Sequence, residues 1–193
     1  MIAVIKYNAG NIKSLSFALQ RLGVDFTVTS NVAEIQRADK VIFPGVGEAS
    51  TTMQYLREHR LDAVIKNLKQ PVLGICLGMQ LMCRHSEENN TECLGIFDEP
   101  VIRIPAQNGL KVPHMGWNKL HNEKDWLSEL PQEAYAYFVH SYYVPVNTST
   151  SASCSYGVKI SAALKKDNFY ALQFHPEKSS KTGEIILTKF LNL

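Results

Sequence analysis

The sequence lacks the features that mark membrane proteins, secreted proteins and proteins that bind nucleic acid. No apolar run approaches the roughly 20 residues that a membrane-spanning helix requires. The N-terminus has neither the basic start nor the cleavage site of a signal peptide. The formal net charge is only +2 and Lys and Arg form no cluster, which argues against a nucleic-acid or membrane surface. We therefore expect a cytoplasmic protein.

Cysteine is scarce, and the four residues present are not spaced for metal or redox chemistry. None forms the C-x-x-C pair of zinc sites and thioredoxin-type motifs. If Cys76 and Cys83 share a helix, they lie about 10 Å apart, whereas the Cα atoms of a disulfide lie within about 7 Å. No His, Asp and Glu residues have metal-ligand spacing. We expect reduced thiols, no metal and no cofactor, with Cys83, Cys93 and Cys154 as packing residues.

The first half of the chain alternates between strand and helix patterns. Asn11 is placed to N-cap a first helix, and Gly23 follows the end of that helix. The predicted strands are residues 2–5, 25–29, 41–43 and 71–75, and the predicted helices are residues 12–22, 52–57, 61–68 and 76–83. This alternation is typical of a parallel sheet with helices on both faces.

The second half contains short β-rich runs that are separated by turns. These runs are residues 101–104, 137–139, 142–146, 158–163 and 169–174, and only residues 183–191 return to helical spacing. Residues 148–153 are interpreted as a polar loop. We predict an α/β fold, a single domain over residues 1–193, with a mostly parallel sheet and antiparallel strands in the C-terminal half.

The segment Gly74-Ile75-Cys76-Leu77-Gly78 is the most informative part of the sequence. It follows an apolar strand and precedes a helix, which is the context of a nucleophile elbow. The flanking glycines allow a sharp turn, and the helix N-terminus favours the thiolate of Cys76. The N–H of Leu77 points where an oxyanion would form. On this segment alone, a buried structural cysteine is the alternative.

A second segment, Phe174-His175-Pro176-Glu177, follows the last predicted strand. In an extended H-x-E, Glu177 can hold one imidazole nitrogen of His175 while the other nitrogen faces Cys76. A thiolate nucleophile needs such a base and such an orienting acceptor. A His near a Glu is usually a surface pair, but together with the cysteine elbow a Cys-His-Glu triad is favoured.

A third segment, Phe43-Pro44-Gly45-Val46-Gly47, ends another parallel strand. Glycine-rich turns at this position leave backbone N–H groups unpaired for a substrate. A phosphate-binding P-loop is excluded because no Lys-Ser/Thr follows. We interpret the segment as half of an oxyanion hole that partners Leu77.

These three motifs, in this order and spacing, resemble the class I, triad-type glutamine amidotransferases, which have a flavodoxin-like fold. More narrowly, the chain is similar to the glutaminase subunits of imidazole glycerol phosphate synthases. The similarity spans nearly the whole chain, and the segments that carry the narrower match include Pro44-Gly45-Val46-Gly47, Pro113-His114-Met115-Gly116-Trp117-Asn118, Tyr137-Phe138-Val139-His140-Ser141-Tyr142 and Gln173-Phe174-His175-Pro176-Glu177-Lys178-Ser179.

The resemblance implies that Cys76 attacks the side-chain amide of glutamine and that His175, held by Glu177, protonates the ammonia that leaves. The oxyanion would face the N–H groups of Val46 and Leu77, and water would then cleave the γ-glutamyl thioester. The implied glutamine-binding residues are Gly47, Gln80, Glu88, Ser141 and Tyr142. Glu88 suits the α-ammonium, with an acidic surface helix end as the alternative.

The resemblance also implies a partner, a (β/α)8-barrel cyclase subunit in a heterodimer that makes imidazole glycerol phosphate in histidine biosynthesis. Trp117, Asn118 and Tyr137 match positions that face this partner, although an aromatic core would also explain the two rings. His114 and His140 receive no chemical role.

Three alternatives stay open on the sequence. The chain could supply ammonia to another synthase, such as an anthranilate or pyridoxal phosphate synthase, although the P-G-V-G and H-M-G-W-N segments argue against both. It could be a stand-alone cysteine peptidase or γ-glutamyl hydrolase, or a non-catalytic binding subunit. The chain also departs from the family pattern at Lys6-Tyr7, where an acidic residue often precedes the aromatic one, and at Ser180, where glycine is common.

Overall fold

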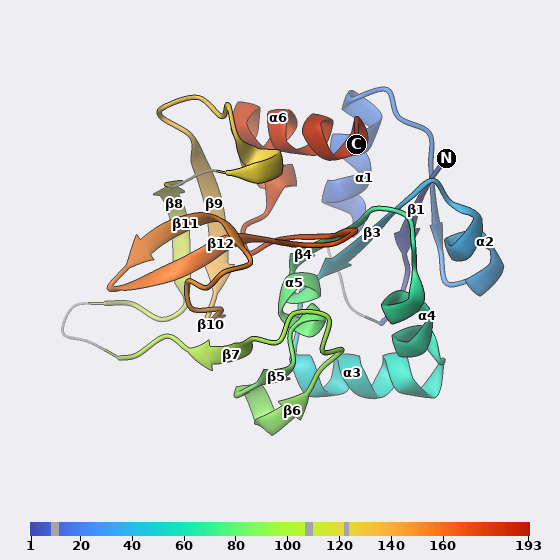
Figure 1. The fold of residues 1–193 in the computed structure, drawn as a ribbon, viewed down its shortest axis with the longest axis horizontal. Helices are drawn as coiled ribbons and strands as arrows, with labels where there is room; N and C mark the ends of the chain where they lie inside the picture. The colour runs from blue at the N-terminus through green and yellow to red at the C-terminus, as the bar shows by residue number, and fades with distance from the viewer. Residues whose placement is uncertain (9–11, 107–109, 122–123) are drawn as a thin grey trace.

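The computed structural model describes residues 1–8, 12–106, 110–121 and 124–193 (Figure 1). Its main sheet has seven strands in the order β11-β12-β13-β4-β3-β1-β2. The strands are β1 (Ile2–Ile5), β2 (Phe26–Thr29), β3 (Lys40–Gly45), β4 (Val72–Cys76), β11 (Thr150–Tyr156), β12 (Val158–Lys166) and β13 (Phe169–Leu172). The five strands from β13 to β2 are mutually parallel. Strand β12 runs antiparallel to β13, and β11 runs antiparallel to β12. The predicted fold class is confirmed.

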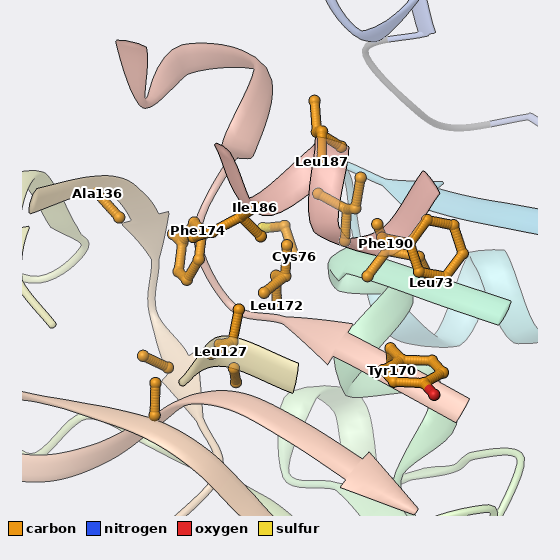
Figure 2. Packing of buried hydrophobic residues seen from close by; sticks show 14 of the residues in the cluster. Leu73, Cys76, Leu127, Ala136, Tyr170, Leu172, Phe174, Ile186, Leu187 and Phe190 are labelled. Carbon is orange, nitrogen blue, oxygen red and sulfur yellow. The ribbon is translucent and has the colours of Figure 1, made fainter. Parts of the chain in front are cut away.

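Helices cover both faces of this sheet, as the alternating pattern predicted (Figure 1). They are α1 (Ile12–Arg21), α2 (Val32–Arg37), α3 (Ala49–Glu58), α4 (Leu61–Asn67), α5 (Leu77–Met82) and α6 (Ser180–Leu191). On one face, Ile186 and Phe190 of α6 pack in one cluster with Leu172 of β13 (Figure 2). Because neighbouring side chains of a strand point to opposite faces, Val4 joins this cluster and Ile5 joins the cluster on the other face, with α2 to α5.

Two small sheets, built from residues 85–143, lie beside the main one. A four-stranded sheet has the order β10-β7-β5-β6, and a two-stranded sheet pairs β8 with β9. The strands are β5 (His85–Ser86), β6 (Thr91–Glu92), β7 (Pro100–Arg103), β8 (His114–Lys119), β9 (Tyr135–His140) and β10 (Tyr142–Tyr143). Three short 3-10 helices complete the fold, η1 (Glu88–Asn90), η2 (Asp125–Leu127) and η3 (Pro176–Lys178).

The interpretation of residues 148–153 as a polar loop is wrong. Thr150–Tyr156 is an edge strand, β11, that pairs antiparallel with β12. The hydroxyl of Thr150 is hydrogen-bonded to the hydroxyl of Ser161, which also donates to the carbonyl of Pro145. Because cross-strand partners satisfy these hydroxyls, the segment can be buried despite its polarity.

One further difference lies in the first half of the chain. The sequence did not predict α2, which has only six residues and a single buried side chain, Ile35. The helix predicted over residues 12–22 is present as α1, and Gly23 follows it with a φ of 68°. The N-cap predicted for Asn11 lies outside the described residues.

Within the described residues, no helix has the length and hydropathy of a membrane span, and no group of three His, Cys, Asp or Glu side chains is arranged to hold a metal ion. The four cysteines are free and buried. Burial raises the pKa of the Cys93 and Cys154 thiols to about 12, and that of Cys83 above its usual value. These three thiols stay protonated at neutral pH, as expected of packing residues.

Ser180, one of the two departures from the family pattern, begins α6 with a φ of 49°. The left-handed region costs an L-residue about 1–2 kcal/mol, and glycine loses about 0.5–1 kcal/mol more than other residues when its backbone is ordered. We therefore expect Ser180→Gly to raise the free energy of unfolding in urea by about 0.5–1 kcal/mol.

The matched control for that change is Thr188→Gly, at an exposed position inside the same helix. There the backbone is ordinary helix, so glycine should destabilise the protein by a few tenths of a kcal/mol, up to about 0.5 kcal/mol. If both glycines destabilise the protein, the left-handed backbone at Ser180 carries no strain.

Candidate active site

The chain makes the predicted sharp turn at Cys76, and the backbone of this residue is strained. Strand β4 ends at Cys76 and α5 begins at Leu77, so the cysteine itself forms the turn. Its φ is 53° and its ψ is −110°, which an L-residue rarely adopts. The turn also needs glycine at Gly78, because a Cβ there would lie 2.0 Å from the carbonyl oxygen of Phe43 in β3. Close packing of α5 against β3 thus holds Cys76 at the carboxyl edge of the sheet.

His175 and Glu177 lie just after β13, in a buried pair. The Nδ1–H of His175 donates to Oε1 of Glu177 at 2.8 Å, and the side chains are 4% and 3% exposed. This predicted contact is confirmed, but only His175 has the extended backbone that suggested it, because Pro176 and Glu177 lie in a 3-10 helix. His175 caps the 3-10 helix η3, which starts with Pro176, a residue favoured at the first position of a helix because its φ is fixed.

Cys76 and His175 interact within one electrostatic unit. Burial opposes the protonation of His175, but hydrogen bonds to Cys76 and Glu177 and the charges of the same two groups outweigh it and raise the pKa of His175 to about 10. The imidazole is therefore protonated at neutral pH when it faces a thiolate. The thiol of Cys76 also lies 3.7 Å from the carbonyl oxygen of Val139, which it can contact as a donor.

A cavity of about 320 Å³ brings together most of the residues that the sequence singled out. From that group its lining includes Val46, Gly47, Cys76, Leu77, Gln80, Glu88, Ser141, Tyr142 and His175. Glu177 lies behind His175 and does not line it. The volume is near the lower end for ligand pockets, which suits a ligand the size of an amino acid.

A hydrogen bond from Tyr7 holds the glycine-rich turn at residues 44–47 in place. The hydroxyl of Tyr7 donates to the carbonyl oxygen of Pro44. Burial, and then the charge of Cys76, raises the pKa of Tyr7 far above its usual value, so the hydroxyl stays a donor. The Lys6-Tyr7 departure thus keeps an aromatic residue that supports the turn beside the nucleophile.

Glu88 lines the cavity near a second carboxylate, that of Glu48. Oε2 of Glu88 accepts from the N–H of Ala49 at 2.8 Å. Burial raises the pKa of Glu88, the Ala49 hydrogen bond opposes this, and the nearby charge of Glu48 adds to it. A positively charged group placed here would relieve the repulsion between the two carboxylates.

The comparison with known families shows to which family the chain belongs. A sequence model described as "Glutamine amidotransferase class-I" matches residues 3–193, nearly the whole chain. The chain belongs to the class I glutamine amidotransferase family. The fold class and the arrangement of Cys76, His175 and Glu177 agree with that membership.

Curated relatives of this amidotransferase carry a narrower name. The chain is 59% identical to the imidazole glycerol phosphate synthase subunit HisH of Bacteroides thetaiotaomicron, over 100% of this chain and 99% of that protein. It is 47% identical to the subunit of the same name from Pasteurella multocida, over 98% and 96% of the two chains. The match to the first of these relatives spans every segment that carried the narrower resemblance.

Solved structures support the class I amidotransferase fold. PurLQS of Thermotoga maritima superposes with a TM-score of 0.73 at 14% identity, over 99% of this chain and 97% of that one. A structure named glutamine amidotransferase gives a TM-score of 0.74 at 16% identity, over 98% and 99% of the chains. At such low identity the likeness concerns the fold alone.

Three positions in this class I amidotransferase matter to the site although sequence reasoning assigned them no role. Gln173 is buried, with Nε2 3.9 Å from Sγ of Cys76 and Oε1 accepting from Gln80 at 3.0 Å. The hydroxyl of Ser179 donates to the carbonyl oxygen of His175 at 2.6 Å and accepts from the N–H of Tyr137 at 2.9 Å. Both residues lie in the Q-F-H-P-E-K-S segment, which was a signal that could have found them.

The third missed residue is Glu48, which directly follows the glycine-rich turn. Its carboxylate caps α3 by accepting from the N–H groups of Ser50 and Thr51, and it also accepts from the side chain of Asn89 in η1. These hydrogen bonds lower its pKa to about 2 against the opposing effect of burial. A Glu three residues before Thr51, at the start of a helical pattern, was the available signal.

The three residues predicted to face a partner lie on the β8–β9 pair, outside the cavity. Trp117 is 53% exposed and meets Tyr137 edge-on, with the ring centroids 5.8 Å apart. The side chain of Asn118 donates to the carbonyl oxygen of Ser155 at 2.9 Å. The exposure of Trp117 excludes the aromatic-core interpretation for that ring.

The same strand pair contains two buried histidines, His114 and His140, 2% and 6% exposed. Burial lowers the pKa of His114 to about 4. Burial also lowers the pKa of His140, to about 3, with the charges of His114 and His175 acting in the same direction and a hydrogen bond to Tyr142 opposing them. Both imidazoles are neutral at physiological pH.

These depressed values predict a loss of stability in acid. Free histidine titrates near pH 6.5, so the unfolded chain takes up protons before the folded protein as the pH falls. The contribution is complete above about pH 6.5 and is lost as the pH falls toward 4, with a slope of up to about 1.4 kcal/mol per pH unit for each histidine. Urea unfolding between pH 4.5 and 7.5 measures it.

In that experiment, His114→Gln removes one of the two titrating groups and should make the dependence on pH shallower. His121→Gln changes an exposed histidine and serves as the matched control. Equal slopes for His114→Gln and the wild-type protein would contradict the depressed pKa of His114.

Proposed function

We propose that the chain is the glutaminase subunit of an imidazole glycerol phosphate synthase and that it acts in histidine biosynthesis as one domain over residues 1–193. The observation that carries the proposal is the buried Cys76–His175–Glu177 arrangement at the edge of a cavity sized for an amino acid. The curated relatives, which are named as HisH subunits of imidazole glycerol phosphate synthase, support the pathway and the existence of a partner subunit.

In the proposed reaction, the thiolate of Cys76 attacks the side-chain carbonyl carbon of glutamine. The C=O electrons move to the oxygen, and the N–H groups of Val46 and Leu77 stabilise that oxyanion. The oxyanion then collapses and expels the amide nitrogen, which takes a proton from His175 and leaves as ammonia. A γ-glutamyl thioester on Cys76 remains.

Water then attacks the thioester and gives a proton to His175, so that glutamate leaves and the thiolate of Cys76 is restored. The hydrogen bond from Nδ1 of His175 to Glu177 keeps the ring oriented through both steps and favours its protonated form. The pKa of about 10 suits a group that must arrive at the first step with a proton. The balance is glutamine plus water to glutamate plus ammonia.

Glutamine is oriented by the rest of the cavity. The α-ammonium faces Glu88, where the neighbouring charge of Glu48 already makes the electrostatic potential negative. Gly47, Gln80, Ser141 and Tyr142 contact the remaining backbone groups of the substrate. A positive charge at Glu88 lowers the repulsion between the two carboxylates, so the site favours an amino acid over a simple amide.

The ammonia goes to a partner subunit, because free ammonia is protonated and lost in water. We propose that this partner is a (β/α)8-barrel cyclase that docks on the face of β8 and β9 with Trp117, Asn118 and Tyr137. Trp117 supports this choice, since exposed tryptophans are enriched at the centres of interfaces. Transfer of ammonia to a different synthase is the second candidate. The two candidates are distinguished by which partner protein binds this chain.

Cys76→Ala should abolish the release of glutamate from glutamine, because no nucleophile remains. Glu177→Gln should lower kcat by on the order of 10²-fold, because the amide neither orients His175 in the same tautomer nor stabilises its protonated form. Cys83→Ala, a second buried cysteine seven residues away, is the control and should keep the wild-type rate. Glutamate release by Cys76→Ala at the wild-type rate would exclude the proposed function.

Trp117→Ala should weaken binding to the cyclase barrel of the same organism by at least about tenfold, while glutaminase activity of the separate chain stays unchanged. Calorimetric titration gives the affinity. Tyr55→Ala on α3, which lies across the molecule from β8 and β9, is the matched aromatic control (Figure 1). An unchanged affinity would exclude this face as the docking surface, and a wild-type chain that fails to bind would exclude the cyclase.

A further inference from the structure

His114 and His140 form a pair of buried histidines that the proposed reaction does not use. They lie directly opposite each other in the antiparallel pair of β8 and β9. Nδ1 of His114 lies 3.0 Å from Nε2 of His140. The ring of His114 stacks between Tyr156 and Phe138, with centroid distances of 3.9 and 4.9 Å. Aromatic rings and the contact with His140 therefore hold His114 in place, while His140 itself lines the cavity.

The hydrogen-bond partners allow only one direction of donation through this pair. Nδ1 of His140 lies 2.8 Å from the carbonyl oxygen of Tyr142, which only accepts, so Nδ1 carries the proton. In a neutral ring Nε2 of His140 then accepts, and Nδ1–H of His114 must donate to it. Nε2 of His114 is left as an acceptor, and the amide of Asn118 is placed to donate to it at 3.4 Å.

This order of donation requires both rings to be neutral. A proton added to Nε2 of His140 would face the N–H of His114 and would break the contact. His175, which is protonated, is the charged group on the cavity side of His140 and disfavours a second positive charge there. On the other side, the aromatic rings around His114 carry no charge.

This series of hydrogen bonds ends at the side of the cavity where glutamine is proposed to bind. The carbonyl oxygen of Tyr142 accepts from His140 and also from Nε2 of Gln80 at 2.9 Å. Gln80 in turn donates to Gln173, whose Nε2 lies 3.9 Å from Sγ of Cys76. The two donors fix the turn at Ser141 and Tyr142 against α5, so the shape of this side of the cavity depends on the tautomer of His140.

We propose that His114 and His140 are positioning residues for glutamine binding: a chain of two neutral imidazoles, donating from Asn118 toward Tyr142, holds the Ser141–Tyr142 turn in the shape that binds the substrate. The inference rests on the proposed function, because it assigns glutamine to this cavity. It adds two residues that act through the carbonyl oxygen of Tyr142 rather than by hydrogen bonds to the substrate, and it gives the H-M-G-W-N segment a role inside the protein.

The kinetic test compares two substitutions of His114 in the full chain, assayed with glutamine. His114→Phe keeps a ring between Tyr156 and Phe138 but leaves Nε2 of His140 without a donor. We expect the KM for glutamine to rise about tenfold while kcat stays within about twofold of the wild-type value. With its Nε2 buried and unpaired, His140 is no longer held in the tautomer whose Nδ1–H donates to Tyr142 and fixes the turn. His114→Gln keeps a donor and an acceptor, and its KM should stay within about threefold of the wild-type value.

A purely structural role would give a different pattern. Both variants would then lose thermal stability in proportion to the change in packing, with KM unchanged or with KM and kcat altered equally in the two. Either result overturns the proposal, as does a KM for His114→Gln as high as that for His114→Phe.

A spectroscopic test needs no substitution and so does not depend on whether a variant folds. Long-range ¹H–¹⁵N NMR correlations of the wild-type protein should show both imidazoles neutral with the proton on Nδ1 between pH 6 and 8. A charged ring, or the proton on Nε2 of either histidine, overturns the proposal. Failure of the proposed function is recognised separately, because a wild-type chain without Cys76-dependent glutamine turnover would still show the tautomers.

Discussion

The close crossing of β3, β4 and α5 is the constraint on which the rest of the site depends. Because Gly78 lacks a side chain, α5 can start against the backbone of Phe43, and the chain between β4 and α5 must then turn within a single residue. That residue is Cys76. Its neighbours in the sheet, β3 and β13, run parallel to β4, so the loops that follow all three strands meet at the same edge. The loops after β3 and β13 therefore lie on either side of Cys76, because the sheet already aligns the ends of these strands.

Local sequence was sufficient wherever the chemistry depends on neighbours in the chain. The turn at Cys76 and the contact between His175 and Glu177 were predictable, because each needs only a few consecutive residues. The parallel sheet was predictable from the βα alternation. The strand at Thr150–Tyr156 was not, because its hydroxyls become suited to burial only when β12 supplies their partners. A short helix such as α2 has too few buried positions to show a period.

The missed parts of the site share a second property, which is that they join segments distant in sequence. Glu48 links the start of α3 to η1, and Gln173 links β13 to α5. His114 and His140 are 26 residues apart and become partners only through the register of β8 and β9. The result is a cavity in which one imidazole, that of His175, is positively charged and another close to it, that of His140, is neutral. Burial alone would leave both neutral, and the difference comes from the thiol and carboxyl groups beside His175.

The position of β13 in the sheet also sets when the site can come into existence. This strand lies between β4 and β12, near the middle of the sheet, although it is built from residues 169–172. Its partner in β4 begins at Val72, so closing this pair brings together residues about a hundred positions apart, and such distant contacts form slowly. When Cys76 and the glycine-rich turn have left the ribosome during synthesis, β13 and the histidine that follows it have not yet been made. Fragments produced during synthesis therefore hold a thiol without its base, and hydrolysis begins only when the centre of the sheet has closed.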